Sequence, residues 1–276
     1  MSQLYPEKES ARLLVLVQAV RTGDKNALDQ LVRALKDGIY GIALRMVTCP
    51  TDAEDVTQEV LIKIMIKLDS FRGDASLRTW AYRITVNHIL DRRKSRVEEL
   101  GLDFDMFGQD LAHGLSESSE TEQELVQEVK LGCSLAMLTC LSREQRIAYI
   151  LGEVFNLSSR LAAEIADVDE QVYRQRLSRA RNQLESFTKA YCGVINQDND
   201  CRCERRVEQA IKVGRVKPDK LIFAQHPRLE STIEEMDLLY STASLMRSHP
   251  RYSAPERILE GLRELINDSS LGILNS

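Results

Sequence analysis

Aromatic, amide and cationic side chains alternate along residues 80–94 with the spacing of one side of a helix. Cations neutralise phosphates, an aromatic ring stacks on bases and an amide reads a base edge, so this combination is typical of a nucleic-acid surface. A lone tryptophan would more often belong to a core, and the interpretation therefore depends on the whole set. The set comprises Trp80, Arg83, Asn87 and Lys94, with Arg92 and Arg93 beside the last of them.

A second cationic stretch, residues 141–187, has the pattern of a helix-turn-helix. Ser158 is expected to cap a helix over 159–166, Asp167-Val168-Asp169 to form the turn, and Asp169 to cap a helix from Glu170 to about Phe187. The start of such a second helix reaches base edges in the major groove, and its flanks contact phosphates. The base-edge candidates are Gln171, Arg174, Gln175 and Ser178, the phosphate candidates are Arg176, Arg179 and Arg181, and the inward residues are Val172, Leu177, Ala180, Leu184 and Phe187. An ordinary basic helix in solvent is the alternative, which the turn and the cap disfavour.

Residues 51–68 place acids and isoleucines on one side of a predicted helix, at 100° per residue. An acidic patch that continues into exposed isoleucines predicts a docking surface for a protein partner. The isoleucines could equally pack under a neighbouring helix, and the sequence leaves both possibilities open. The residues on this side are Asp52, Asp55, Glu59, Ile62 and Ile66.

The net charge of −5 hides a strong segregation of charge along the chain. Residues 72–97 carry seven Lys or Arg and two acids, and residues 174–189 carry five Lys or Arg and one acid. Between them, residues 98–124 hold nine acids and no Lys or Arg. Two basic patches on either side of an acidic strip indicate a nucleic-acid partner, which the total charge alone would argue against.

The segments that carry these side chains are all predicted to be helices. We expect an all-α protein of two helical domains joined by an acidic linker, with a mostly helical C-terminal extension. Residues 100–121 show no helical period. Helices are predicted at 8–21, at 26–46, from a cap at Thr51 or Asp52 to 68, and at 77–96, 229–247 and 254–267, and the predicted domain boundaries are 1–96, 97–127, 128–190 and 191–276.

Several classes of function are disfavoured by what the sequence lacks. It has no phosphate-cradling glycine motif, no HExxH and no nucleophile elbow, and its four histidines stand apart, so we expect neither an enzyme nor a cofactor. Its longest apolar run is far shorter than the roughly 20 residues that cross a bilayer, so no membrane partner is expected. Six cysteines in 276 residues make no disulfide framework, which favours a cytoplasmic protein.

These motifs resemble the extracytoplasmic-function (group 4) sigma factors of bacterial RNA polymerase. The stretch from Asp52 to Val60 looks like their region 2.2 helix. Phe71-Arg72-Gly73-Asp74, followed by Thr79-Trp80 and Val86-Asn87, looks like region 2.3, and residues 141–184 are similar to region 4. The resemblance covers residues 27–96 and 128–187, about half of the chain.

The resemblance implies a non-enzymatic subunit that directs core polymerase to specific promoters and assists −10 melting. In that family the region 2.2 helix docks on the β′ clamp helices, region 2.3 opens the −10 element, and region 4 reads the −35 element. The implied partners are core RNA polymerase (β′ clamp helices and β flap) and promoter DNA, with an anti-sigma factor as a further candidate. The implied polymerase-binding residues are Asp52, Asp55, Gln58, Glu59 and Ile62. The implied −10 residues are Phe71, Arg72, Arg78, Trp80, Arg83, Asn87, Arg92, Arg93 and Lys94, and the −35 residues are Gln171, Arg174, Gln175, Arg176, Ser178, Arg179 and Arg181.

A stand-alone helix-turn-helix transcriptional regulator with an N-terminal helical sensing domain is the alternative. Such a regulator usually dimerises on a palindrome and needs neither the Phe71–Asn87 set nor an acidic docking helix, so we prefer the sigma factor. The region 4 match also has departures that affect promoter geometry. Ser142 replaces the usual Pro, Asp167 replaces the usual Gly, and Arg160 and Leu161 replace a pair of Glu.

The extension beyond residue 190 is absent from minimal members of that family and contains three cysteines. Cys192, Cys201 and Cys203 stand near arginines, which are expected to lower the thiol pKa and to favour a soft metal or a disulfide. Three thiols with a Cys-x-Cys spacing make no usual zinc site, so we prefer a plain helical extension and assign no metal. In either case the extension is expected to regulate by covering a polymerase- or DNA-binding face.

Overall fold

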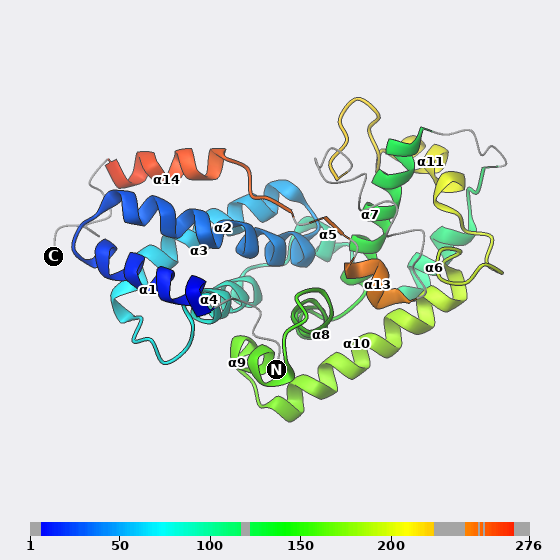
Figure 1. Cartoon of the computed structure of the whole chain (residues 1–276). Helices are drawn as coiled ribbons and strands as arrows, with labels where there is room; N and C mark the ends of the chain where they lie inside the picture. Colours follow the sequence, from blue (N-terminus) through cyan, green and yellow to red (C-terminus); the bar gives the residue numbers. More distant parts are fainter. Residues whose placement is uncertain (1–6, 117–121, 224–240, 248, 251, 268–276) are drawn as a thin grey trace. The chain divides into compact units, whose positions relative to one another are not determined.

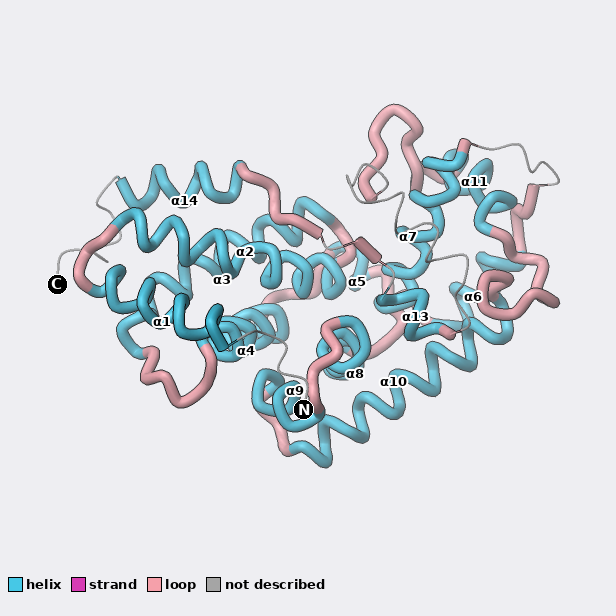
Figure 2. Tube along the Cα trace, viewed as in Figure 1, coloured by secondary structure: helices cyan, strands magenta, loops and turns pink. Residues whose placement is uncertain are grey.

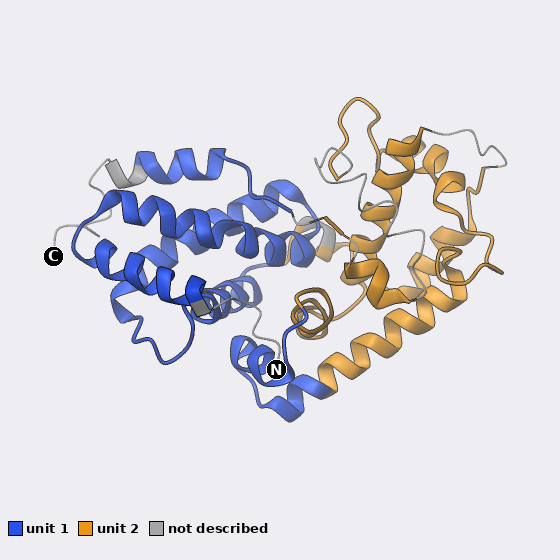
Figure 3. Ribbon diagram, in the orientation of Figure 1, with its two compact units in different colours: residues 1–93, 156–174, 251–276 blue, residues 94–155, 175–250 orange. Residues whose placement is uncertain are grey.

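The computed structural model describes residues 7–116, 122–223, 241–247, 249–250 and 252–267, and the regular elements in these ranges are all helices (Figures 1 and 2). The expected all-α class is confirmed. None of the described helices is long and apolar enough to cross a membrane. Two compact units make up the chain, and Figure 3 colours them separately.

The first unit contains the described residues of Met1–Arg93, Asn156–Arg174 and Arg251–Ser276. α2 is its centre and packs against α1, α3, α4 and α14, while α9 packs against α4. The helices of this unit are α1 (Glu7–Arg21), α2 (Lys25–Val47), α3 (Pro50–Lys67), the 3-10 turn η1 (Leu68–Ser70), α4 (Leu77–Asp91), α9 (Ser159–Ala166) and α14 (Arg257–Asn267).

Helix α2 is buried along most of its length: every residue from Ile39 to Val47 is buried, whereas Gln30, Arg33 and Asp37 in its first half are exposed. Leu35, Ile39 and Ile42 are fully buried, and complete burial of such a side chain contributes about 1.5–3 kcal/mol. A Cβ at position 38 would overlap the Tyr82 hydroxyl of α4. Gly38 therefore permits the close approach of α2 and α4.

The starts of the first helices follow from their capping residues. The Asp24 carboxylate accepts the amide of Asn26 at 2.8 Å and caps α2. α3 begins earlier than expected, because its N-cap position is Cys49 rather than Thr51 or Asp52. Pro50 occupies the first helical position, where its fixed φ suits a helix and its missing N–H removes no hydrogen bond.

The predicted end of the fourth helix at Arg96 is wrong. α4 ends at Asp91, and Arg92 has an extended backbone. Ser95 and Glu98 form a capping box, in which the Ser95 hydroxyl accepts the Glu98 amide at 3.3 Å and the Glu98 carboxylate accepts the Ser95 amide at 2.9 Å. This reciprocal cap starts the short helix α5 (Arg96–Glu99) and competes with continuation of α4.

The second unit contains the described residues of Lys94–Phe155 and Gln175–Pro250. α7 packs against α8 and α11, and α13 packs against the π-helix η2. The helices of this unit are α5, α6 (Phe104–Ala112), α7 (Gln123–Thr139), α8 (Arg143–Tyr149), η2 (Ile150–Val154), α10 (Glu170–Tyr191) from Gln175 onward, α11 (Cys203–Lys212) and α13 (Thr242–Arg247).

Helix α6 lies in the acidic stretch for which the sequence predicts no helix. The Asp103 carboxylate caps it by accepting the Met106 amide at 2.8 Å. Phe104 and Phe107 lie against Phe187 of α10, with ring centroids 5.2 and 5.4 Å apart. The apolar face of α6 is short and is interrupted by glycine and acids. The sequence therefore shows no clear helical periodicity of apolar residues in this stretch.

The extension contains helices near both predicted positions. α13 covers the end of the first predicted helix, whose residues 229–240 lie outside the described residues. The second begins at Arg257 rather than at residue 254. The Ala254 backbone is held instead by Lys36 and Asp37 of α2, which delays the start of α14.

An ion-pair cluster around Glu98 links α5 to α8. The Glu98 side chain is 4% exposed and accepts hydrogen bonds from Arg143 Nη2 at 2.7 Å and Arg146 Nη1 at 3.0 Å. Burial raises the pKa of Glu98, but the two arginines and the Ser95 amide outweigh it and lower the pKa to about 2. The acid therefore stays ionised inside the fold and neutralises two enclosed cations.

Replacement of Glu98 by Gln is expected to lower the free energy of unfolding by about 3 kcal/mol at pH 7, because Arg143 and Arg146 lose their counterion. Since the folded-state pKa of Glu98 is depressed, its contribution is present above the ordinary value of 4.5 and is lost as the pH falls towards 2. In urea unfolding, the difference in the free energy of unfolding between wild type and Glu98→Gln should therefore become smaller from pH 6 to pH 3. The exposed neighbour Glu99→Gln should change stability by less than about 0.5 kcal/mol. A difference in the free energy of unfolding that stays constant across this pH range would contradict the lowered pKa of Glu98.

Candidate functional site

The acidic side of α3 is largely open to solvent. Asp55 and Glu59 are exposed, Asp52 and Ile62 are half-buried, and Ile66 is 56% exposed. Of the two possibilities left open for the isoleucines, exposure holds for Ile66 and partial packing for Ile62. The opposite side of α3 faces the core through Val56, Val60, Leu61, Ile64 and Met65. The periodicity of this helix therefore separates its faces as the sequence predicts.

His88 of α4 contacts two charged residues of α3 on this side. Nothing in the sequence selects His88, because it stands apart from the other histidines. Its Nε2 lies 2.9 Å from the Glu59 carboxylate and its Nδ1 lies 2.6 Å from Lys63 Nζ. Burial and the adjacent Lys63 cation lower the pKa of His88, against the opposing effect of Glu59. The imidazole thus stays neutral at pH 7 and holds Glu59 in position without cancelling its charge.

The solvent side of α4 presents part of the expected nucleic-acid set. Arg83 and Asn87 are exposed, and Trp80 is half-buried. Phe71 is buried and lies against Trp80 with ring centroids 5.4 Å apart. The Arg21 guanidinium donates to the carbonyls of Phe71 and Leu68 at 2.6 and 3.0 Å. Phe71 therefore supports Trp80 from below, and Arg21 fixes the start of the loop.

Lys94 does not belong to this face of α4. The helix ends at Asp91, so the spacing of seven residues between Asn87 and Lys94 does not place the two side chains on one helix face. Arg78 forms an ion pair with Glu9 of α1, and its side chain is only 14% exposed. The remaining cations of the set differ in exposure: Arg72 and Arg93 are exposed, and Arg92 is half-buried.

Helix α9 packs against α4, and one ion pair joins its end to the face just described. The Arg83 guanidinium lies 2.6 Å from the Asp167 carboxylate. Asp167 is in the left-handed region at φ 54°, where it ends α9 as a C-cap and supplies the predicted turn. Both side chains are about half exposed. An exposed pair of this kind is worth about 1 kcal/mol or less, so Arg83 can exchange Asp167 for a phosphate at small cost.

Both helices of the helix-turn-helix begin where the sequence predicts, and the first also ends there, whereas α10 runs to Tyr191 and not to about Phe187. The Ser158 hydroxyl accepts the Leu161 amide and caps α9, which covers Ser159–Ala166, and α10 begins at Glu170. The prediction that Val172 points inward is wrong, because Val172 is 37% exposed and Tyr173 is fully buried. Tyr173 lies four, seven and eleven residues before Leu177, Ala180 and Leu184, which are buried as predicted, so Tyr173 rather than Val172 continues their inward side of the helix.

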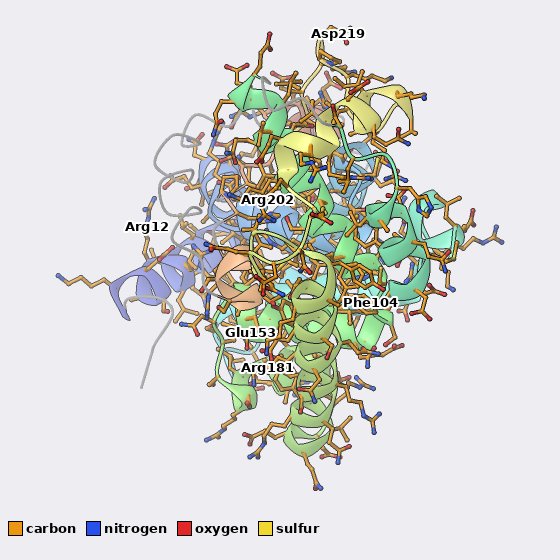
Figure 4. All side chains as sticks on the ribbon, turned by 90° about the vertical axis from the view of Figure 1, so that its right-hand side faces the viewer. Arg12, Phe104, Glu153, Arg181, Arg202 and Asp219 are labelled. Carbon is orange, nitrogen blue, oxygen red and sulfur yellow. The ribbon has the colours of Figure 1, made fainter. Side chains whose placement is uncertain are left out.

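The exposed residues of α10 include most of the predicted −35 set. Arg174 forms an exposed ion pair with Glu170 at 3.1 Å. Arg181 Nε donates to the Glu153 carboxylate of η2 at 2.6 Å, and Figure 4 labels the two side chains. Arg247 of α13 lies 3.7 Å from the same carboxylate. Gln171, Gln175, Ser178 and Arg179 are exposed, and Arg176 is half-buried.

Comparisons with known proteins show which family this chain resembles. The Sigma-70 region 2 family model matches residues 31–98, which contain α3 and α4. The RNA polymerase sigma-H factor of Pseudomonas aeruginosa is 31% identical over 176 residues, which make up 62% of this chain and 90% of that protein. The ECF RNA polymerase sigma-E factor of Escherichia coli K12 is 31% identical over 178 residues, 62% of this chain and 92% of that protein.

The chain belongs to the extracytoplasmic-function sigma factors. It therefore acts with RNA polymerase in transcription initiation, and the stand-alone regulator is not favoured. The solved structure of CnrH in complex with the cytosolic domain of CnrY is similar over 66% of this chain and 98% of its own, with 22% identity and a TM-score of 0.48.

Four of the six thiols of this sigma factor lie near one another in the second unit. Cys192, Cys201 and Cys203 lie close enough to Cys133 of α7 for the thiols to influence one another's pKa. Cys133 is absent from the sequence candidates, because the packing of α7 on α11 has no signature in residue spacing. In the part of the chain that the structure describes, no three His, Cys, Asp or Glu side chains are arranged to hold a metal ion.

The expectation that these thiols have a lowered pKa is wrong for Cys201 and Cys203. Burial raises the pKa of Cys201 to about 11 and outweighs the nearby Arg206, Arg202 and Arg205. Burial also raises the pKa of Cys203 to about 12. A partly buried thiol whose neighbouring cations do not outweigh the cost of its burial stays protonated, and a protonated thiol is a poor nucleophile and a poor metal ligand.

At pH 7.5, Cys201 and Cys203 are therefore expected to react with iodoacetamide at least tenfold more slowly than free cysteine, whose pKa is about 8.5. The rate should rise continuously with pH up to about 10, because the thiolate fraction is still increasing there. Mass spectrometry of the alkylated peptides measures both rates, and urea-unfolded protein provides the control. Alkylation of either thiol at the rate of free cysteine would contradict the raised pKa values.

Proposed function

We propose that this sigma factor binds core RNA polymerase through α3, opens the −10 element with α4 and the loop before it, and reads the −35 element with α10. The observation that carries the proposal is the division of one packed bundle into an acidic exposed face on α3 and an aromatic, cationic face on α4. Each helix turns its other face to α2. A single rigid unit would thus hold a protein contact and a nucleic-acid contact at constant separation.

The chemistry of the α3 face suits a protein partner with cations and a small apolar surface. Asp55 and Glu59 offer exposed carboxylates, and Ile66 offers an exposed apolar side chain. Complementary charges steer association, and a desolvated apolar centre holds the complex. We assign Asp52, Asp55, Gln58, Glu59 and Ile62 to the clamp helices of the β′ subunit on the family resemblance.

The α4 face suits DNA whose bases have been unstacked. Removal of one base from the stack costs a few kcal/mol, which the protein must offset. Trp80, supported by Phe71, offers a ring for stacking, Asn87 offers an amide and Arg83 a cation. In the proposed mechanism these groups stabilise the open strand, with Arg72, Arg92 and Arg93 adding positive potential along the backbone. Arg78, which is paired with Glu9, and Lys94, which lies beyond the end of α4, are assigned to the −10 element on the family resemblance alone.

The exposed start of α10 suits the major groove at −35. Gln171, Arg174, Gln175 and Ser178 lie along its solvent side, and Arg179 flanks them. Each DNA contact of a single helical domain is weak. Two such contacts on one polymerase act as a bivalent reader, because the second binding event becomes intramolecular. The β flap is the proposed support for this domain.

We further propose that the protein works in the cytoplasm, has no catalytic activity of its own and is controlled by an anti-sigma factor. The relatives named above are sigma factors, which act by binding rather than by chemistry. The predicted domain boundaries at 1–96, 97–127, 128–190 and 191–276 are part of the same proposal.

Substitutions on the two faces of the first unit should separate the two functions. Asp55→Ala and Glu59→Ala are each expected to weaken core-polymerase binding roughly three- to tenfold, because a charge complementary to the partner is lost. Arg83→Ala and Asn87→Ala should leave that affinity within about twofold and reduce open-complex formation roughly tenfold. Fluorescence anisotropy measures binding, and permanganate footprinting of the −10 element measures opening.

Two exposed residues outside both faces provide matched controls. Lys25→Ala removes a cation and Glu99→Ala removes an acid, and neither should change binding or opening. Thermal unfolding of each variant checks that the bundle is intact, above all for Glu59→Ala, which frees His88. An equal loss of core affinity in all four test variants would refute the division of roles.

A further inference from the structure

Helix α14 of the C-terminal extension lies on the bundle that carries α3 (Figure 1). Ile258, Leu259 and Leu262 are almost fully buried, whereas Glu260 and Glu264 are exposed. This helix thus has one apolar face, and that face is turned to α2 and α3. Burial of three aliphatic side chains makes the docking specific rather than a chance surface contact.

The segment before α14 is anchored to α2. Lys36 Nζ donates to the Ala254 carbonyl at 3.0 Å, and the Ala254 amide donates to the Asp37 carboxylate at 2.9 Å. The Tyr252 ring lies over the buried Arg45 guanidinium, with 4.9 Å from its carbon to the ring centroid. These three contacts set the point at which the extension reaches the bundle and the direction in which α14 leaves it.

Ion pairs then orient α14 along the bundle. Arg263 Nη2 lies 2.7 Å from the Asp29 carboxylate of α2, and Arg257 forms an ion pair with Glu54 of α3. Burial raises the pKa of Asp29, but hydrogen bonds from Arg33 and Arg263 outweigh it and lower the pKa. The cations of α14 therefore meet acids of both helices.

Helix α14 also lies close to α3 at Gly261. A Cβ at this position would lie 3.1 Å from Gln58 Nε2, which is tighter than ordinary contact. Gln58 belongs to the proposed polymerase-binding set, and it lies between Glu54 and Ile62 on successive turns of α3. Positions 54 and 58 are each about 100° around the helix from positions 55 and 59. The side of α3 that α14 covers and the side proposed for polymerase are therefore adjacent, and they share Gln58.

We propose that α14 is a built-in competitor of core RNA polymerase, which must leave α2 and α3 before the polymerase can occupy the docking face of α3. The inference rests on the proposed function of α3. A helix with its side chains is about 10–12 Å across, so a second helix at Gln58 stands in the space that a partner on Asp55, Gln58 and Glu59 would need. α14 also offers α3 the chemistry expected of that partner, a cation for Glu54 beside an apolar stripe.

The docking of α14 is suited to release. A hollow of about 530 Å³ remains where the start of α2 meets α14, lined by Asn26, Asp29, Leu259 and Leu262 among others. The ion-pairing side chains Arg257 and Arg263 are themselves 68% and 50% exposed. Incomplete packing and solvated ion pairs contribute little free energy, so a competing partner can displace the helix.

Two substitutions release α14 by different physical routes in the full-length chain. Gly261→Leu pushes the helix away from Gln58 by steric overlap, and Arg263→Glu sets an acid against Asp29. Glu260→Leu introduces the same leucine on the exposed side of α14, and Lys212→Glu makes the same charge change on an exposed residue of the second unit. Hydrogen exchange of the α14 amides reports release, and fluorescence anisotropy reports affinity for core polymerase.

Both releasing variants are expected to accelerate exchange in α14 and to bind core polymerase about tenfold more tightly, because the binding-competent fraction rises. The two control variants should match wild type in both measurements. Faster exchange combined with unchanged or weaker affinity would overturn the proposal, the weaker affinity indicating that α14 is itself part of the polymerase contact.

Failure of the proposed function is distinguishable in the same assay. Asp55→Ala should weaken polymerase binding both in the wild-type chain and in the Gly261→Leu background. If Asp55→Ala changes neither affinity while Gly261→Leu tightens binding, the docking face has been misplaced and α14 competes elsewhere. If Asp55→Ala weakens binding and released variants do not bind more tightly, the docking face stands and the competition by α14 is rejected.

Discussion

The burial of α2 by the helices that pack around it is the constraint on which the first unit depends. Because α1, α3, α4 and α14 all pack against this one helix, each of them must turn an apolar face inward and keep its charged side chains outside. Asp55 and Glu59 on α3 and Arg83 and Asn87 on α4 are exposed for this reason. Gly38 brings α4 close enough for Tyr82 to lie against α2, which limits relative movement of the two faces.

The sequence predicts the parts of this arrangement that depend on periodicity. The core and solvent sides of α3, the cap at Ser158 and the turn at Asp167 follow from local rules, and all three occur as expected. Features that depend on a competing local structure are missed. The capping box of Ser95 and Glu98 ends α4 early, and the aromatic contacts of Phe104 and Phe107 create α6 in a stretch without visible period.

Features that depend on tertiary burial cannot be derived from neighbours in the sequence. Arginines near Cys201 suggest a reactive thiolate, yet enclosure of the thiol reverses the direction of its pKa shift. His88 is not close in the sequence to any candidate ligand or catalytic residue, and it contacts Glu59 only because α3 and α4 pack together.

The cations proposed for DNA also differ in how readily the fold can release them. Asp167 is 55% exposed, so water can replace Arg83 when that arginine turns to a phosphate. Glu153 is only 9% exposed, and without Arg181 it would keep only the more distant Arg247 at 3.7 Å. Loss of a partner from an enclosed acid is costly, because the remaining charge is poorly solvated. Arg181 thus serves mainly to hold α10 against η2, and the proposed reading of DNA by α10 would fall to Arg174, Arg179 and the exposed amides of Gln171 and Gln175.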